Sequence, residues 1–312
     1  MKKILISIAT IVVVIVIGAG VVNFLNSRDQ SPFPAGPNDG GQDLGQDDQV
    51  PAQPEHCPSI EVISAPGTWE SAADDDPMNP QANPRSFMLS ITNPLRETYA
   101  PDDVKVWTLP YTAQFRNINA QNELSYDDSR NEGTDRLNEE LRFMNESCPQ
   151  TKFFLTGFSQ GAVIVGDIID EIGGGTGMVP ADKILGSVLI ADGRREPGVG
   201  INPGVELEGI GAEIALQPVS GLVQPIVPGA TMRGARPNGF GELADRTYTI
   251  CSPADSICDA PRGIGNALDR AFELIGANGI HAQYATNGAV IPGTTANAWT
   301  EGYIRKVIED NR

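Results

Sequence analysis

The pentapeptide GFSQG at residues 157–161 restricts the fold of this chain more than any other feature. It joins residues 152–156, an apolar run typical of a buried strand, to residues 160–172, where apolar side chains recur at helical spacing. Such a tight turn from strand to helix leaves little room for side chains, which accounts for the flanking glycines. It also presents the hydroxyl of Ser159 in the position of a catalytic nucleophile. The alternative is an incidental serine in a glycine-rich turn.

The rest of the chain alternates between strand-like and helix-like segments. Further strands are predicted at residues 59–64, 104–109, 184–191 and 246–250. Helices are predicted at residues 86–99, with a break at Pro94, and at residues 126–146, 263–274 and 299–309. Alternation of this kind is typical of an α/β fold with a parallel sheet and right-handed crossovers.

An apolar segment follows the lysines at the amino terminus. Residues 4–25 are long enough to cross a bilayer as a helix, and no clear A-x-A cleavage site follows them. The lysines favour a cytoplasmic amino terminus, which places the rest of the chain outside. We therefore expect a signal-anchor helix at residues 1–25, with a cleaved signal peptide as the alternative. Residues 26–55 are rich in Pro, Gly, Asp and Gln and predict a disordered linker, so the folded domain is expected at residues 56–312.

The formal net charge of −18 restricts the partners of the protein. Nucleic-acid binding rewards Lys and Arg that contact phosphates, so no nucleic-acid partner is expected. Electrostatic attraction to anionic lipid is not expected either, so membrane association has to come from the N-terminal segment. Asp74, Asp75 and Asp76 are consecutive and cannot all converge on one ion, which favours a solvated loop over a metal site.

A serine nucleophile needs a base, and histidine serves best near neutral pH. The sequence contains two histidines. His56 lies at the edge of the predicted linker, whereas His281 lies in a loop before the last helix. We therefore expect His281 to be the base, and the alternative is an incidental loop histidine.

Two aspartates follow strands at suitable places, Asp192 and Asp255. We favour Asp255, because it follows the last strand before the candidate base and completes the order Ser, Asp, His of α/β-hydrolases. It lies within CSPADSIC, where a disulfide between Cys251 and Cys258 would close a small loop and fix the carboxylate. A zinc site is not favoured there, because no second closely spaced cysteine pair completes four ligands.

Two other segments are candidates for contact with a ligand. Gly67 and Thr68 follow the first predicted strand, and Thr68 either donates to an oxyanion or caps the next segment. Residues 197–240 are rich in Gly and Pro but contain many apolar residues. This segment is either a functional loop or lid, or a packed excursion that covers a sheet edge.

Taken together, these motifs resemble the cutinase family. The resemblance spans residues 57–312 and is closest to the cutinase-like proteins of mycolate-containing actinobacteria, which often carry an N-terminal membrane anchor. It is carried by Cys57-Pro58 before the first strand, Gly67-Thr68 after it, Cys148-Pro149 before GFSQG, CSPADSIC, and a histidine before the closing helix.

The resemblance implies a cutinase-like α/β-hydrolase fold, a five-stranded parallel sheet flanked by helices in a three-layer sandwich. It implies no metal and no organic cofactor. It also implies specific site residues: a triad of Ser159, Asp255 and His281, an oxyanion hole from Thr68 and the backbone amide of Gln160, and the disulfides Cys57–Cys148 and Cys251–Cys258.

The expected function is that of an exported serine esterase that hydrolyses lipid or acyl esters through an acyl-enzyme. The alternatives are an acyltransferase that acts on cell-envelope lipids or glycans, and a non-catalytic envelope-binding protein with the same fold. Residues 197–240 form a longer segment than in fungal cutinases, so cutin is not assumed to be the substrate. A membrane tether suggests an envelope ester instead.

Overall fold

The structure is a computed structural model, and it describes residues 53–263, 265–276 and 279–312. These residues belong to one compact unit, Pro51–Arg312. The predicted membrane segment and almost all of the predicted linker lie outside the described residues. Within the described ranges, no helix combines the length and the apolar character that crossing a bilayer requires.

A parallel sheet of five strands forms the centre of the domain. The strands are β1 (Ile60–Ala65), β2 (Val104–Thr108), β3 (Lys152–Phe158), β4 (Ile184–Ile190) and β5 (Thr247–Ile250), in the spatial order β2-β1-β3-β4-β5. Every neighbouring pair is parallel. The predicted strands and the predicted α/β class are confirmed, with boundaries that differ by one or two residues.

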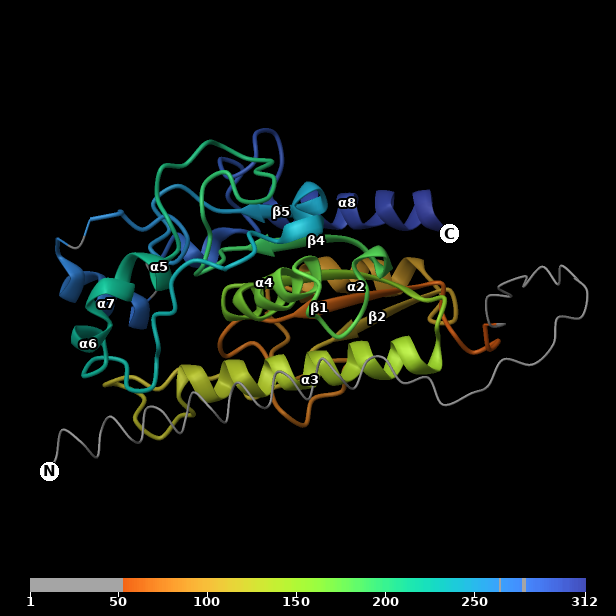
Figure 1. Cartoon of the computed structure of the whole chain (residues 1–312), viewed down its shortest axis with the longest axis horizontal. Helices are drawn as coiled ribbons and strands as arrows, with labels where there is room; N and C mark the ends of the chain where they lie inside the picture. Colours follow the sequence, from red (N-terminus) through yellow and green to blue (C-terminus); the bar gives the residue numbers. More distant parts are fainter. Residues whose placement is uncertain (1–52, 264, 277–278) are drawn as a thin grey trace, which may run out of the picture. The chain divides into compact units, whose positions relative to one another are not determined.

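Helices cover both faces of the sheet and give three layers (Figure 1). Helices α2 (Leu89–Thr98) and α8 (Ala296–Asn311) pack on one face, and α3 (Tyr126–Ser147) and α4 (Gln160–Gly173) pack on the other. Alternate strand residues point to opposite faces, so Val62 and Phe154 pack with α2 and α8, whereas Ile63 and Leu155 pack with α3 and α4. Because both faces are covered, the strands read as nearly continuous apolar runs.

The predicted break at Pro94 is wrong. Helix α2 continues from Leu89 to Thr98 with Pro94 inside it. Proline removes one N–H donor from the helix, and the carbonyl that loses its partner is that of Ser90, four residues earlier. Ser90 is exposed, so water can satisfy this carbonyl and the helix continues.

Residues 197–240 contain two short helices, α5 (Ala212–Leu216) and α6 (Ser220–Val223), in an otherwise mostly irregular segment. The end of the segment is held against α4. The Asp170 carboxylate accepts hydrogen bonds from the backbone N–H groups of Asn238 (3.2 Å) and Phe240 (3.0 Å). A Cβ atom on Gly173 would lie 1.9 Å from the carbonyl oxygen of Phe240, so the two backbones touch directly. The segment is therefore packed onto the domain.

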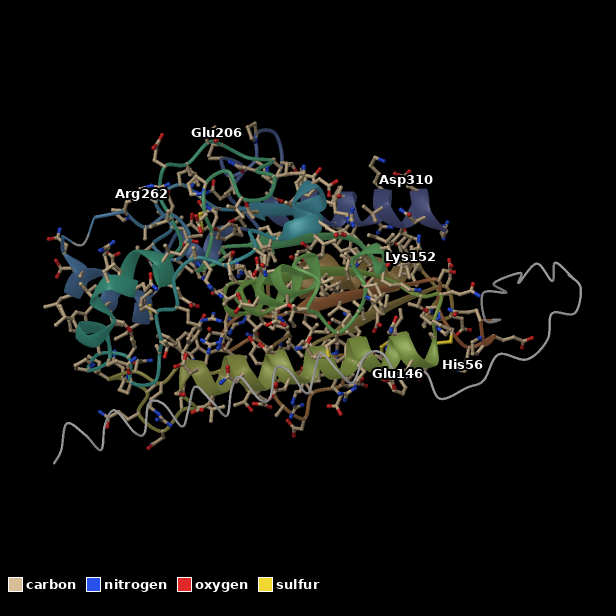
Figure 2. The ribbon with its side chains drawn as sticks, in the orientation of Figure 1. His56, Glu146, Lys152, Glu206, Arg262 and Asp310 are labelled. Carbon is tan, nitrogen blue, oxygen red and sulfur yellow. A yellow bond between two sulfur atoms is a disulfide. The ribbon has the colours of Figure 1, made fainter. Side chains whose placement is uncertain are left out.

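Two disulfides join the described cysteines in the pairs that the resemblance implies. Cys57–Cys148 connects the residues just before β1 to the end of α3, and Cys251–Cys258 closes the loop after β5. In Figure 2, His56 and Glu146 mark the end of the domain where the first disulfide lies.

Glu61 on β1 is a fully buried carboxylate on the α3 side of the sheet. Its Oε1 lies 2.9 Å from Nζ of Lys105, its paired neighbour on β2. Lys105 also forms an ion pair with Glu140 of α3. Burial raises the pKa of Glu61 to about 8; the charge of Glu140 adds to this effect and that of Lys105 opposes it.

This raised pKa predicts that stability depends on pH. Between the ordinary pKa of 4.5 and about 8, the folded protein retains a proton on Glu61 that the unfolded chain has released. Stability therefore falls as the pH rises through this interval, by at most about 1.4 kcal/mol per pH unit. The glutamine of Glu61→Gln does not titrate, so the free energy of unfolding of this variant is expected to vary less over the same interval. Urea unfolding of both proteins at several pH values measures the difference, and parallel curves would contradict the prediction.

Candidate active site

Ser159 occupies a strained turn between β3 and α4. Its backbone has φ 54° and ψ −118°, a conformation that residues with a side chain rarely adopt. The flanking glycines make this turn sterically feasible. A Cβ atom on Gly161 would lie 2.0 Å from the carbonyl oxygen of Ala65, and one on Gly157 would lie 2.4 Å from the carbonyl oxygen of Gly161. The sequence motif thus folds as the predicted sharp elbow between strand and helix, with Ser159 at its tip.

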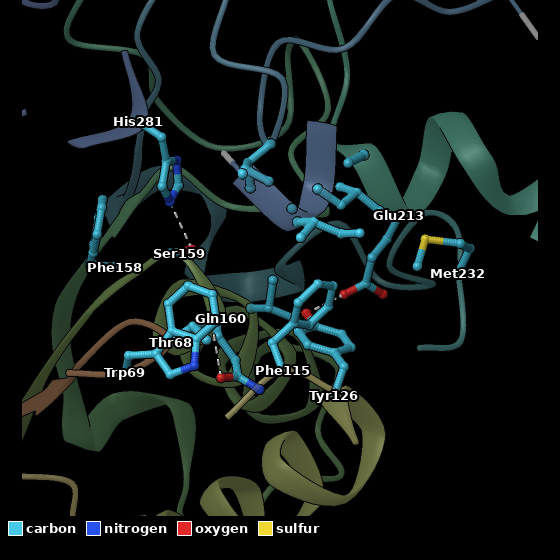
Figure 3. A pocket seen from close by; sticks show the side chains of 17 residues that line it. Thr68, Trp69, Phe115, Tyr126, Phe158, Ser159, Gln160, Glu213, Met232 and His281 are labelled. Atoms are coloured by element: carbon cyan, nitrogen blue, oxygen red, sulfur yellow. Dashed lines mark hydrogen bonds between the residues drawn. The ribbon is translucent and has the colours of Figure 1, made fainter. Parts of the chain in front are cut away.

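Two hydrogen bonds connect Ser159, His281 and Asp255, which the sequence separates widely. His281 Nε2 lies 2.9 Å from Ser159 Oγ, and His281 Nδ1 lies 2.9 Å from Asp255 Oδ2 (Figure 3 shows the first bond). His281 begins a single-turn helix, His281–Gln283, and its ring stacks on Phe158 at a centroid distance of 5.0 Å. In this arrangement a histidine can accept the serine proton while the carboxylate stabilises the resulting imidazolium.

Asp255 is fully buried, and several donors hold its carboxylate. Oδ2 accepts a hydrogen bond from the hydroxyl of Tyr284 (2.7 Å), and Oδ1 accepts one from the backbone N–H of Ile257 (3.0 Å). Burial, reinforced by the charge of Asp255, raises the pKa of Tyr284 well above its usual range, so Tyr284 remains a donor. The role of Tyr284 could not be predicted from the sequence, because a tyrosine three residues after a histidine is not a motif.

Asp192, the less favoured candidate acid, is paired with an arginine. It is fully buried, and its two carboxylate oxygens accept hydrogen bonds from Nη1 (2.6 Å) and Nη2 (3.1 Å) of Arg236. This bidentate pair ties residues 197–240 to the chain after β4, which is a structural role.

Thr68 and Gln160 lie together at the carboxyl ends of β1 and β3. Thr68 Oγ1 donates a hydrogen bond to Gln160 Oε1 at 3.3 Å. Gln160 is the first residue of α4, so its backbone N–H has no partner within the helix and the positive end of the helix dipole lies at the serine. Such a position suits a developing negative charge on a carbonyl oxygen.

Glu70 fixes the loop that carries Thr68. Its carboxylate accepts hydrogen bonds from the backbone N–H groups of Gly67 (3.1 Å) and Phe87 (2.9 Å), and burial raises its pKa. This role of Glu70 could not be predicted from the sequence, because it depends on a contact with the distant residue Phe87.

A cavity of about 170 Å³ opens beside Ser159 (Figure 3). Most of its wall is apolar and includes Phe115, Val163 and Leu274, the last from α7 (Ala267–Gly276). Residues 197–240 contribute Met232 and a buried carboxylate, Glu213. The cavity can therefore accept the apolar chain of an ester held at Ser159.

A cluster of potential metal ligands lies at the first disulfide. Within the described part of the chain, His56, Cys57 and Cys148 place ligand atoms within 4.8 Å of one another. The two cysteines form a disulfide, so neither can supply the thiolate that a metal ion would need.

Comparison with known proteins gives consistent matches. Residues 56–289 match the family model described as Cutinase. A carboxylesterase Culp6 homologue of Corynebacterium glutamicum is 59% identical over 311 residues, which cover 99% of this chain and 100% of that protein.

Solved structures with weaker similarity include a cutinase-like protein from Cryptococcus sp. It is 18% identical, with a TM-score of 0.47, over 82% of this chain and 98% of that chain. An iodinated acetyl xylan esterase is 15% identical, with a TM-score of 0.47, over 81% of this chain and 99% of that chain. The family model and the carboxylesterase relative indicate the same family. By these two matches, the chain belongs to the cutinase family of carboxylic ester hydrolases.

Proposed function

We propose that this protein is an exported serine esterase in which Ser159 is the nucleophile, His281 the base and Asp255 the residue that orients the base. The observation that carries the proposal is the pair of 2.9 Å hydrogen bonds linking these three side chains. The 59% identical relative, named as a carboxylesterase, supports the same reaction.

The reaction proceeds in two steps. His281 Nε2 accepts the proton of Ser159 Oγ as this oxygen attacks the ester carbonyl, and the imidazolium then protonates the departing alcohol. The backbone N–H of Gln160 stabilises the negative charge on the carbonyl oxygen, together with the hydroxyl of Thr68, which exchanges its hydrogen bond to Gln160 Oε1 for one to the substrate. Water, deprotonated by His281, then attacks the acyl-enzyme and releases the acid.

The proposal includes retention at a membrane through residues 1–25, with residues 26–55 as a tether. The apolar run at residues 4–25 supports retention at a membrane. The two disulfides support export, because disulfides persist in oxidising extracytoplasmic compartments. A tethered domain of this kind fits a lipid or acyl ester of the cell envelope.

Covalent labelling tests both parts of this proposal. Cells that express the full chain are treated with a fluorophosphonate and fractionated, and the labelled residue is identified by mass spectrometry. We expect one adduct at Ser159, in the membrane fraction, and no adduct in Ser159→Ala. Ser90→Ala, which removes the hydroxyl of an exposed serine on α2, serves as the matched control and is expected to label normally.

The outcomes separate the parts of the proposal. An unlabelled wild type would overturn the assignment of Ser159, and a labelled protein in the soluble fraction would overturn membrane retention. Purified protein is then assayed with p-nitrophenyl esters of increasing chain length. Hydrolysis that persists in Ser159→Ala would contradict the mechanism, and labelling without hydrolysis would favour acyl transfer to another acceptor.

A further inference from the structure

We propose that Glu213 is a specificity residue that accepts a hydrogen bond from a hydroxyl group on the chain of the ester that enters the cavity. The inference rests on the proposed function, because it concerns the substrate of the same site. It assigns to this enzyme a preference for hydroxylated acyl chains over plain ones.

The position of Glu213 in the cavity is unusual. Glu213 lies in the first turn of α5, lines the cavity and is only 4% exposed, whereas most of the surrounding wall is apolar. Figure 3 shows its carboxylate between Tyr126 and Met232. A purely apolar chain has no donor to offer this carboxylate, so it would gain nothing from the contact.

The hydrogen bonds of Glu213 leave room for one more donor. Oε1 accepts from the hydroxyl of Tyr126 (2.7 Å) and from Nη2 of Arg233 (3.1 Å), and Oε2 accepts from Nε of Arg233 (2.9 Å). An ionised carboxylate has about four acceptor positions, and these three bonds from described residues use three of them. The remaining position is on Oε2.

The charges around Glu213 favour a neutral donor over a cation. Arg233 contacts both oxygens of Glu213 and also pairs with Asp167. A cationic chain would therefore meet a guanidinium group at the carboxylate. The surrounding network is balanced, with the carboxylates of Asp167, Asp192 and Glu213 paired with the guanidinium groups of Arg194, Arg233 and Arg236. An alcohol can donate a hydrogen bond here and keep its proton, so the charge balance is undisturbed.

Two variants separate recognition from structural support. Glu213→Gln keeps the shape but removes the charged acceptor, and Arg233 retains Asp167 as a partner. Tyr126→Phe keeps the carboxylate and removes one of its donors, which frees a further acceptor position. If Glu213 only supports Tyr126, both variants will behave alike.

The test compares ethyl hexanoate with ethyl 3-hydroxyhexanoate and ethyl 6-hydroxyhexanoate, using the full chain and following acid release by titration. We expect wild type to prefer at least one hydroxylated ester by kcat/KM. We expect the ratio of kcat/KM for that ester to kcat/KM for ethyl hexanoate to fall about tenfold in Glu213→Gln, because hydrogen bonds to charged groups are the stronger ones. Tyr126→Phe is expected to keep the wild-type ratio or to raise it.

Each other result would overturn the inference. It fails if wild type prefers ethyl hexanoate to both hydroxylated esters, if the ratio is unchanged in Glu213→Gln, or if Tyr126→Phe lowers the ratio as much as Glu213→Gln does. In those cases ethyl hexanoate is still hydrolysed and the proposed function stands. If none of the three esters is hydrolysed, the proposed function fails and the inference fails with it.

Discussion

Asp255→Asn is expected to lower kcat by about 10⁴-fold, the loss typical of a triad whose acid becomes an amide. The side-chain amide can donate a hydrogen bond to His281 Nδ1, which would leave the proton on Nε2 and the histidine unable to accept one from Ser159. The amide also cannot stabilise the imidazolium. Because Asn has the same shape and the Cys251–Cys258 loop is closed by a disulfide, the protein should remain folded. Steady-state kinetics and circular dichroism measure the two quantities.

Asp259→Asn is the matched control for this prediction. Asp259 lies just after the same disulfide loop, and its carboxylate accepts hydrogen bonds from the backbone N–H groups of Ala254 (2.8 Å) and Gly209 (3.1 Å). The Asp259→Asn variant should lose little activity, because the hydrogen-bond partners of Asp259 are these backbone groups and not His281. An equal loss in both variants would mean that the loop geometry matters and not the carboxylate next to His281. An unchanged rate in Asp255→Asn would remove Asp255 from the mechanism.

Gly161→Ala is expected to destabilise the protein by at least about 3 kcal/mol, at the upper end for inserting one methyl group. The new Cβ atom would lie 2.0 Å from the carbonyl oxygen of Ala65 and 2.5 Å from that of Pro66. Neither backbone atom can move away as a flexible side chain could, so α4 has to shift away from β1. The shift also displaces the N–H of Gln160, so activity should be lost. Urea unfolding and ester hydrolysis measure the two effects.

Gly302→Ala is the contrasting substitution. Gly302 lies inside α8, and a Cβ atom there meets nothing within 4 Å apart from the adjacent residues and backbone of its own helix. Alanine should stabilise this helix by about 0.5–1 kcal/mol, because glycine loses more backbone entropy on folding. If both substitutions prove equally mild, close contact between the elbow and β1 is not what requires Gly161.

The strands could be predicted because their sequence signals are local. The candidate triad could be predicted because few residues were available for its positions. A parallel sheet produces apolar runs that can be read directly, and only two histidines were available to act as base. The disulfide pairing came from the family resemblance. The error at Pro94 has a physical cause, since the outcome depended on whether one carbonyl faces water, which a periodic pattern does not contain.

The supporting residues could not be predicted, because their roles depend on contacts between distant parts of the chain. Glu213 receives a hydrogen bond from Tyr126, 87 positions earlier, and Tyr284 reaches Asp255 across 29 positions. The sequence also left two readings for residues 197–240, an active-site loop or a packed excursion. The segment is packed on α4 through Asp170 and also provides part of the cavity wall, so the two readings are not exclusive.

The Cys57–Cys148 disulfide has a mechanical consequence. Cys57 precedes β1, so the chain enters the domain at the amino ends of the strands, whereas Ser159 and the cavity lie at the carboxyl ends. A six-residue strand such as β1 spans roughly 20 Å between these ends. Tension applied through the residues before Cys57 passes across the disulfide into α3 as well as along β1. The load is thus divided between two elements before it can reach the catalytic end of the sheet.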